Sequence, residues 1–332
     1  MRVGIVGAGF MGRVHAAGWM KTPAQIAGIY SIDRDGAAQL ARTVNGQVYD
    51  DLDALIRDVD VVDICVPTHL HHDMTLRAAA AGKDVVCEKP LARTIEQAQA
   101  MIAACEQAGV KLLVGHVVRF FPQYALAKTA VDRGDVGNVG VVRLTRCSFQ
   151  PRGTSGWFMD TAKSGGMMLD LMIHDFDYAR WVAGEVKSVF AKQVRSHHPD
   201  APGDYALAIL RHEGGAISNI EGGWAYPPPL FRTALEIAGD RGLIEHPAGS
   251  SDPVEVHVQS SGGHSRPDIA VPSSPLAEDP YQVEIRHFYD ILTGAITTPR
   301  VTAADGLAAL QIALAAIESA QTGRPVQVKE MG

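Results

Sequence analysis

The segment from Ser164 to Asp177, SGGMMLDLMIHDFD, places carboxylates and an imidazole within an apolar run. Charged side chains rarely lie among apolar ones without a partner or a function. In a helix, Asp170, His174 and Asp177 would follow one another at steps of four and three residues, which brings them within roughly 60° of each other on one face. An imidazole beside carboxylates is suited to proton transfer at neutral pH, and the same groups are also metal ligands. The segment therefore suggests a functional site of one of these two kinds, the alternative being that His174 is a histidine with its hydrogen bonds satisfied in the core.

A second pattern, GAGFMG, has the spacing GxGxxG and stands between an apolar strand-like run and a helical pattern. In that context the first glycine makes a tight turn, the second admits a pyrophosphate, and the third lets helix and strand pack closely. The N-terminus of the helix supplies N–H donors to the phosphates. We predict that Gly7, Gly9, Phe10, Met11 and Gly12 hold a dinucleotide, the alternative being a turn without a ligand.

The residues that contact the adenosine ribose are expected about 20 residues further on, where the chain reads YSIDRD. Asp33 is placed to bind a ribose 2′-hydroxyl, which favours NAD. Ser31 and Arg34 are placed to accept a 2′-phosphate, which favours NADP. Both cofactors stay open at this point, with NAD slightly favoured because the carboxylate of Asp33 would repel a phosphate.

Two further groups follow strand candidates, at the edge where ligands bind in parallel α/β sheets. One strand ends in Glu88 and Lys89, so Lys89 is placed to meet the reactive end of the cofactor, although a lysine there is often only a solvated charge. A cis peptide before Pro90 would define that turn. After another strand, Pro67, Thr68 and His71 are predicted to bind the cofactor. We expect His69, His71 and His72 to pack on the cofactor side rather than chelate a metal.

The first 120 residues alternate short apolar runs with helical patterns, which predicts a doubly wound parallel sheet. The predicted strands are RVGIV, QIAGIY, VVDICV, DVVCE and KLLVGH. The predicted helices are Gly12–Met20, Gly36–Thr43, Leu70–Ala80 and Thr94–Ala108, the last with the capping signal TIEQ. We assign residues 1–120 to an NAD(P)-binding Rossmann domain.

After Arg119 the apolar runs become longer and several alternate, which predicts an antiparallel sheet covered on one face. These runs are Val139–Phe149, Val186–Val194, Tyr205–Arg211, Ala216–Gly223 and Thr233–Ala238, and two helices are predicted near Gln282–Leu292 and Ala303–Gln321. The segment Gly249–Pro275 is rich in Ser, Gly and Pro and is predicted to be a loop. Residues 121–332 therefore form, by prediction, an α+β domain for substrate binding and oligomerisation.

The composition is that of a globular protein of 332 residues with a net charge of −7 and no Lys/Arg-rich run. It gives no reason to expect nucleic acid or a membrane as a partner. The N-terminus enters the glycine-rich turn at once, unlike a signal peptide. The four cysteines are widely spaced, so we expect reduced thiols and a cytoplasmic location.

The motifs occur in an order that resembles the Gfo/Idh/MocA oxidoreductase family: GxGxxG, then Glu-Lys-Pro, then GG-x3-D-x3-H-x2-D. The resemblance implies a Rossmann domain, a C-terminal domain on a large, open, mainly antiparallel sheet, and hydride exchange between nicotinamide and a sugar, inositol or related polyol. By motif, Lys89, Asp170 and His174 match the catalytic Lys, Asp and His of the family. The acidic residue that binds the ribose in many relatives falls at Ser31, which leaves the choice between NAD and NADP open.

The resemblance also supplies candidates for the substrate pocket. The junction motif of the family often has Asn before its Arg, whereas here Val118 precedes Arg119. Arg119 is therefore a weak substrate candidate. The aromatic rings of Trp157, Tyr226 and Tyr281 would pack on the C–H surfaces of a polyol, or else belong to the core or an interface.

In the mechanism that this family implies, His174 is the general base for alcohol oxidation and the acid for reduction. Lys89 donates a hydrogen bond to the reacting oxygen, and Asp170 orients a hydroxyl or supports the imidazolium. Asp177 is predicted to be structural, and no metal is expected.

Two alternatives use the same residues: a hydrolase or lyase that retains its NAD, and a non-catalytic dinucleotide-binding sensor. Because a large sheet covered on one face leaves the other exposed, we also predict a homodimer or homotetramer.

Overall fold

The computed structural model of the chain describes residues 1–151, 153, 156–195, 204–246 and 278–328. Two compact units emerge: Met1–Phe120 with Ala162–Ser164 and Ser274–Ala308, and Phe121–Thr161 with Gly165–Ser273 and Ala309–Gly332. The predicted loop Gly249–Pro275 lies outside the described residues.

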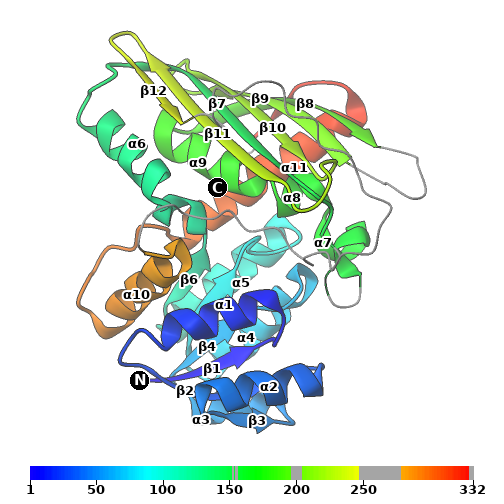
Figure 1. Cartoon of the computed structure of the whole chain (residues 1–332), viewed down its shortest axis with the longest axis vertical. Coiled ribbons are helices and arrows are strands. Elements are labelled where there is room, and N and C mark those ends of the chain that lie inside the picture. The colour runs from blue at the N-terminus through cyan, green and yellow to red at the C-terminus, as the bar shows by residue number, and fades with distance from the viewer. Residues whose placement is uncertain (152, 154–155, 196–203, 247–277, 329–332) are drawn as a thin grey trace. The chain divides into compact units, whose positions relative to one another are not determined.

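The first unit contains a six-stranded, entirely parallel sheet in the order β3-β2-β1-β4-β5-β6 (Figure 1). Its strands are β1 Arg2–Val6, β2 Gln25–Tyr30, β3 Gln47–Tyr49, β4 Val61–Ile64, β5 Asp84–Glu88 and β6 Leu112–Gly115. The chain order reverses between β1 and β4, which is where ligands bind in doubly wound sheets. The predicted parallel sheet is confirmed, and β3 is a strand that the sequence pattern missed.

Helices follow the strands of this sheet in right-handed crossovers, so α1 and α2 lie on the face opposite to α4 and α5. The bounds are α1 Phe10–Trp19, α2 Arg34–Val44, α3 Leu52–Asp58, α4 His71–Ala80 and α5 Ile95–Ala108, with 3₁₀ turns η1 Thr68–Leu70 and η2 Val117–Phe120. The capping prediction for α5 is confirmed, because the Thr94 hydroxyl accepts a hydrogen bond from the Gln97 amide at 3.2 Å. The side-chain oxygen of Gln97, which in a capping box would accept from the Thr94 backbone N–H, accepts from the Arg93 backbone N–H.

The first unit also contains α10, Pro280–Thr293, which the sequence prediction assigned to the second domain. Its apolar side chains Ile285, Phe288 and Ile291 join the core cluster that includes Trp19 of α1. A Cβ added at Gly18 would lie 2.8 Å from Ile285, so this glycine allows the close approach of the two helices. The helix was predicted from its local pattern, but which core it joins depends on this contact.

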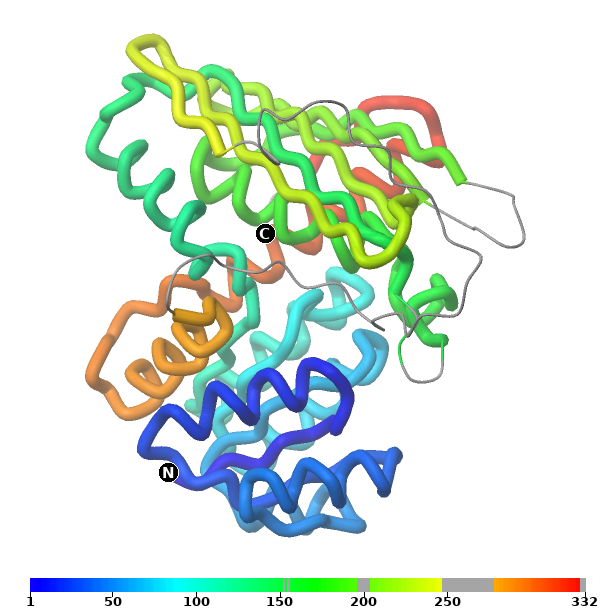
Figure 2. The backbone as a smooth tube through the Cα atoms, in the orientation of Figure 1, coloured from blue at the N-terminus to red at the C-terminus, as the bar shows by residue number. Residues whose placement is uncertain are grey.

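The second unit is built on a seven-stranded sheet in the order β12-β11-β7-β10-β9-β8-β13, in which β7 and β10 are parallel and the other neighbours antiparallel. Figure 2 follows its long strands side by side. The bounds are β7 Val139–Ser148, β8 Val186–Arg195, β9 Asp204–His212, β10 Ile217–Gly223, β11 Phe231–Gly239, β12 Leu243–His246 and β13 Val326–Gln327. The predicted mainly antiparallel sheet is confirmed.

One face of the second sheet is covered and the other is open. Along β9, Ala206, Ala208 and Leu210 are buried while Leu207 and Ile209 are exposed, as expected where alternate side chains point to opposite faces. The other helices in the described residues are α6 Pro122–Asp132, η3 Trp157–Met159, α7 Thr161–Ser164, α8 Met167–Asp170, α9 Ile173–Ala183 and α11 Ala303–Thr322.

Within the described residues, α11 is the one helix long and apolar enough to cross a membrane by length and composition alone. Most of its apolar window, 61%, is buried inside the protein, as in the core helix of a globular domain.

Candidate active site

The glycine-rich loop connects β1 to α1, and two of its three glycines, Gly7 and Gly12, are required by steric contacts. Gly7 has φ +109°, and a Cβ there would lie 2.4 Å from the carbonyl oxygen of Cys65. A Cβ on Gly12 would lie 2.0 Å from the carbonyl oxygen of Gly7, so α1 packs directly on the loop. A Cβ on Gly9 would meet no atom within 4 Å, which leaves the backbone open to a ligand. The geometry requires glycine at Gly7 and Gly12, and the role of Gly9 beside a pyrophosphate stays a prediction.

Gly9 is also the N-cap of α1, and no side chain caps that end of the helix. The first turn, with Phe10 and Met11, contains no acidic residue, so its N–H groups and the positive end of the helix dipole are available to an anion. The open cradle at Gly9 and this uncapped terminus fit the pyrophosphate of a dinucleotide.

The loop after β2 carries the three residues expected near the adenosine ribose. The carboxylate of Asp33 caps α2 by accepting from the Gly36 amide at 3.0 Å, and its side chain lies on the exposed surface. The guanidinium of Arg34 donates to the carbonyl oxygens of Tyr49 and Asp50 at 2.9 and 3.1 Å. The Ser31 hydroxyl is buried and accepts from the Asp33 amide. Arg34 is thus hydrogen-bonded to the carbonyl groups at the end of β3, whereas the Asp33 carboxylate lies exposed in the loop after β2.

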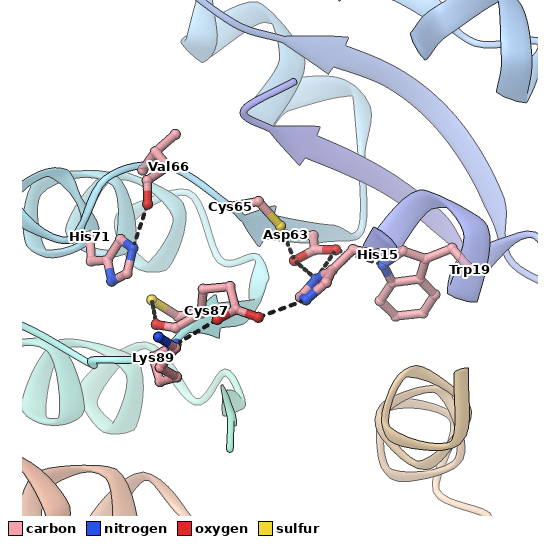
Figure 3. A network of polar contacts seen from close by, with 9 residues as sticks. His15, Trp19, Asp63, Cys65, Val66, His71, Cys87 and Lys89 are labelled. Atoms are coloured by element: carbon pink, nitrogen blue, oxygen red, sulfur yellow. Dashed lines mark hydrogen bonds and ion pairs between the residues drawn. The ribbon is translucent and has the colours of Figure 1, made fainter. Parts of the chain in front are cut away.

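His71 joins the loops after β4 and β5, and Figure 3 shows its contact with Val66. Its ring nitrogens lie 2.9 Å from the Val66 carbonyl oxygen and 2.8 Å from the Pro90 carbonyl oxygen. Burial lowers the pKa of His71, since the charged imidazolium loses hydration there. Its side chain, predicted to contact the cofactor, is buried here and braces the two loops. Thr68 is buried beside it in η1, which Pro67 caps.

Glu88 ends β5 at this same edge of the sheet, followed by Lys89 in a half-buried position. The Lys89–Pro90 peptide is cis. A carboxylate oxygen of Glu88 accepts from the Lys89 amide at 3.1 Å. The first unit therefore gathers the predicted cofactor residues and Lys89 along the carboxyl edge of one sheet.

The candidate acid–base segment of the second unit is not the single regular helix that the spacing predicted. It consists of α8, ending at Asp170, and α9, beginning at Ile173. The Met172 amide donates to the Met167 carbonyl, five residues back, so the chain takes a wider turn between the two helices. A Cβ added at Gly222 of β10 would lie 2.3 Å from Met172, so the side chain of Met172 packs directly on the sheet at this turn.

Asp170 ends α8 and is 8% exposed, while His174 lies in the first turn of α9 and is half-buried. Both belong to the second unit, whereas Lys89 belongs to the first. Asp177 is fully buried one turn further on.

The sequence analysis did not single out Asp175, which points elsewhere on α9. Its carboxylate accepts from the Arg146 Nε and Nη2 atoms at 2.7 and 3.1 Å, with both residues buried. Burial raises the pKa of Asp175 and Arg146 opposes that rise. This ion pair attaches α9 to β7.

Comparison with known proteins follows the same division of the chain. Residues 1–116 match the family described as an oxidoreductase family with an NAD-binding Rossmann fold, and residues 124–245 match the GFO/IDH/MocA C-terminal domain. The chain belongs to the Gfo/Idh/MocA family of oxidoreductases. The resemblance predicted from the motifs is confirmed, as is a nicotinamide dinucleotide as the cofactor class.

Relatives of this Gfo/Idh/MocA protein match it over its whole length. It is 30% identical over 338 residues to an inositol 2-dehydrogenase of Rhizobium meliloti, covering 99% of both chains. It is 30% identical to a scyllo-inositol 2-dehydrogenase (NAD(+)) of Bacillus subtilis, covering 99% of this chain and 96% of that one. A solved structure of levoglucosan dehydrogenase with NADH and levoglucosan has a TM-score of 0.83 and 26% identity, covering 99% of this chain and all of that one.

Two of the four substrate candidates, Arg119 and Tyr281, belong to the first unit. Arg119 is 2% exposed and donates to the Arg300 carbonyl at 2.8 Å, with the Asp305 carboxylate at 3.4 Å, so it has a structural partner within the first unit. Tyr281 is in the first turn of α10, where its amide donates to the capping Asp279.

The other two candidates belong to the second unit. The ring of Trp157 stacks on Phe158 at 4.0 Å between centroids. Burial raises the pKa of Tyr226 to about 12, with a contribution from Cys147. Because Arg146 contacts α9, its neighbour Cys147 points to the opposite face of the sheet, so Tyr226 lies toward the open face.

The candidate metal ligands at Asp170, His174 and Asp177 do not form a close donor group in the part of the chain that the structure describes. The group that does is His15, Asp63 and Cys65, with donor atoms within 4.8 Å of one another. The sequence analysis missed these residues, although a signal existed: Asp63 stands inside the apolar strand run VVDICV, where a buried carboxylate requires partners.

Proposed function

We propose that this protein is an NAD-dependent dehydrogenase that interconverts a secondary alcohol and a ketone on a sugar, an inositol or a related polyol. The observation that carries the proposal is the presence of Lys89, Asp170 and His174, at the positions of the family's catalytic Lys, Asp and His, in a chain that also has an open dinucleotide cradle at Gly9. The relatives named as inositol dehydrogenases, aligned over nearly the whole chain, support this substrate class.

In the proposed reaction, NAD supplies the hydride acceptor for alcohol oxidation and NADH the hydride donor for ketone reduction. His174 takes the hydroxyl proton as the alcohol is oxidised and returns it in the reverse direction. The Lys89 ammonium donates a hydrogen bond to the reacting oxygen and stabilises its developing negative charge. Asp170 accepts a hydrogen bond from a neighbouring substrate hydroxyl and orients the ring.

We propose NAD rather than NADP because of what surrounds the ribose position. Arg34, the cation that would hold a 2′-phosphate, is engaged with the Tyr49 and Asp50 carbonyls and forms an ion pair with the Asp50 carboxylate at 2.7 Å. Asp33 contributes a carboxylate at the tip of β2, which would repel that phosphate and accept a hydrogen bond from a ribose hydroxyl.

The assembly that we propose is a homodimer or homotetramer formed through the open face of the second sheet. That face exposes apolar side chains along neighbouring strands: Val194 on β8, Leu207 and Ile209 on β9, and Ile217 on β10. Aliphatic side chains clustered on one face favour a second copy of the same surface. The four cysteines are buried free thiols, which suits the cytoplasmic location that we propose.

The test is turnover with a panel of inositols, aldoses and sugar acids, measured by nicotinamide absorbance. The expected result is release of reduced cofactor in a 1:1 ratio with oxidised product. Conversion of a glycoside without net reduced cofactor would identify the NAD-retaining hydrolase or lyase. Tight dinucleotide binding with no conversion of any substrate would identify a sensor.

A further inference from the structure

A chain of buried polar groups runs beneath the cofactor edge of the first sheet (Figure 3). The imidazole Nδ1 of His15, on α1, lies 2.9 and 3.0 Å from the two carboxylate oxygens of Asp63 on β4. Its Nε2 lies 2.9 Å from the Glu88 Oε1 atom at the end of β5. These residues are 0%, 0% and 5% exposed, so the contacts are made away from water.

The hydrogen-bond pattern favours the charged imidazole. Ionised carboxylates only accept hydrogen bonds, and between two of them both ring nitrogens of His15 donate, as only the imidazolium can. Asp63 also accepts from the Trp19 indole N–H at 2.7 Å and from the Cys65 thiol at 3.5 Å, as an ionised carboxylate can. Burial alone lowers the pKa of His15, but the charge of Asp63 opposes it and the net pKa lies well above the ordinary value.

The chain continues from Glu88 to the main chain at the proposed catalytic lysine. One oxygen of Glu88 accepts from His15 and the other accepts from the Lys89 amide at 3.1 Å. On the neighbouring strand β6, a Cβ added at Gly115 would lie 3.1 Å from Glu88 Oε1, so a glycine leaves room for the carboxylate. The carboxylate is therefore held on one side by the imidazolium and holds the backbone of Lys89 on the other.

A third acid, Glu284, completes the surroundings. Glu284 of α10 is fully buried, and neither of its carboxyl oxygens has a hydrogen-bond partner among the described residues. Burial raises the pKa of Glu284 well above its ordinary value, the charges of Glu88 and Asp63 raise it further, and His15 lowers it. These effects favour the neutral form of Glu284, so Asp63 and Glu88 are the carboxylates that His15 bridges. The titratable groups that face His15 are Asp63, Cys65, Glu88 and Glu284.

We propose that His15 is a positioning residue for the dehydrogenase: as a buried imidazolium it orients the Glu88 carboxylate, which in turn fixes the main chain at Lys89. The inference rests on the role of Lys89 in the proposed function. His15 touches neither substrate nor cofactor in this role, and it acts only through Glu88.

The first test does not depend on activity. Nitrogen chemical shifts of His15, assigned by comparison with the His15→Gln variant, are expected to report two protonated ring nitrogens at pH 7 to 8. In the variant, the amide hydrogen of Lys89 is expected to exchange at least about 10-fold faster, because a glutamine is uncharged and carries both of its N–H donors on one nitrogen, so it does not reproduce the bridge from Asp63 to Glu88. The matched control is Trp19→Phe, which removes a hydrogen bond to Asp63 but leaves the chain from His15 to Lys89 intact, so Lys89 exchange is expected to stay unchanged.

The second test separates positioning from general stability. Once a substrate is found, His15→Gln is expected to lower kcat by about 10-fold or more, with the Kd for dinucleotide changed by less than about threefold. Trp19→Phe is expected to lower thermal stability without lowering kcat. If His15 acts through Glu88, the effects of His15→Gln and Glu88→Gln on kcat will be strongly non-additive.

A neutral His15 in the folded wild type, unchanged Lys89 exchange in His15→Gln, or additive effects on kcat would each overturn the proposal. If His15→Gln fails to fold, the wild-type nitrogen shifts still decide its charge state, and Glu88→Gln still tests Lys89 exchange. If Lys89 exchanges faster in His15→Gln but the wild type oxidises no polyol, the contacts from His15 to Lys89 are supported. Only the proposed function is then contradicted.

Discussion

Replacing Glu284 by glutamine should make the first unit more stable, and increasingly so as the pH rises. The carboxyl group is fully buried on α10 and has no hydrogen-bond partner in the described part of the chain, so the folded protein favours its protonated form. A glutamine has nearly the same shape and is neutral at every pH. The substitution therefore removes a titration and little else.

The size of the effect follows from proton linkage. In the unfolded chain a glutamic acid loses its proton near pH ~4.3, whereas folded Glu284 retains it, so the folded state binds one more proton above that pH. Wild-type stability then falls by about 1.4 kcal/mol per pH unit, until the folded pKa is reached. Glu284→Gln has no such loss. Its stability relative to the wild type should rise by about 2.5 kcal/mol between pH 5 and pH 7.

Native-state hydrogen exchange of the β1 and β4 amides measures this free energy, because these central strands exchange when the first unit unfolds. Both proteins would be measured without dinucleotide at pH 5, 6 and 7 and constant ionic strength. Any packing difference between the carboxyl and the amide adds a constant at all three pH values, so the slope is the result that matters. The exposed Glu106 of α5 offers a matched control, and Glu106→Gln should change stability by no more than about 0.5 kcal/mol. A stability difference between wild type and Glu284→Gln that stays flat from pH 5 to pH 7 would refute a neutral buried Glu284.

Three further outcomes are expected. Asp33→Asn keeps an acceptor for the α2 cap but removes the charge, so the ratio of kcat/KM with NADP to kcat/KM with NAD should rise by about 10-fold. Asp35→Asn on the same helix turn is the control and should change this ratio much less. The same ratio in Asp33→Asn as in the wild type would contradict the role of Asp33. Arg146→Met leaves Asp175 buried without its cation and should cost about 3–5 kcal/mol in urea unfolding, while adding Asp175→Asn should recover part of that loss. Ile209→Asp places a charge on the apolar open face of the sheet and should shift the protein to monomers, measured by light scattering. A wild type that is already monomeric at micromolar concentration would rule out the proposed assembly.

The cofactor half of the molecule could be predicted closely because its signals are local. The requirement for glycine at Gly7 and Gly12 comes from atoms of the same loop and the adjoining strand ends. Strands buried on both faces leave continuous apolar runs in the sequence, and these located five of the six strands. The missed strand β3 has only three residues, too few for a periodic pattern.

The acid–base segment could be predicted only in part. Its residue types were recognisable, but the spacing predicted one helix where the chain forms α8 and α9. The wide turn at Met172 coincides with its packing against Gly222 on β10, 50 positions further along the chain. The helical periodicity of a single segment contains no information about such a contact.

The buried network is the clearest case of a feature that needs three dimensions. His15, Asp63 and Glu88 lie on three elements, separated by 48 and 25 positions in the chain. In the sequence, each of these residues is a single polar residue near apolar ones. They come together only when the strands pair in the parallel sheet and α1 packs on it. The position of α10, which adds Glu284, also depended on tertiary packing and was assigned to the wrong unit.

The most direct test of the proposed function is the wild-type protein and His174→Ala, each assayed with NAD and with NADP against a panel of inositols, aldoses and sugar acids. We expect the wild type to oxidise at least one polyol, with NAD preferred, and His174→Ala to lose that turnover while its dinucleotide affinity stays unchanged. Equal turnover by His174→Ala, or tight NAD binding without turnover of any substrate by the wild type, would contradict it.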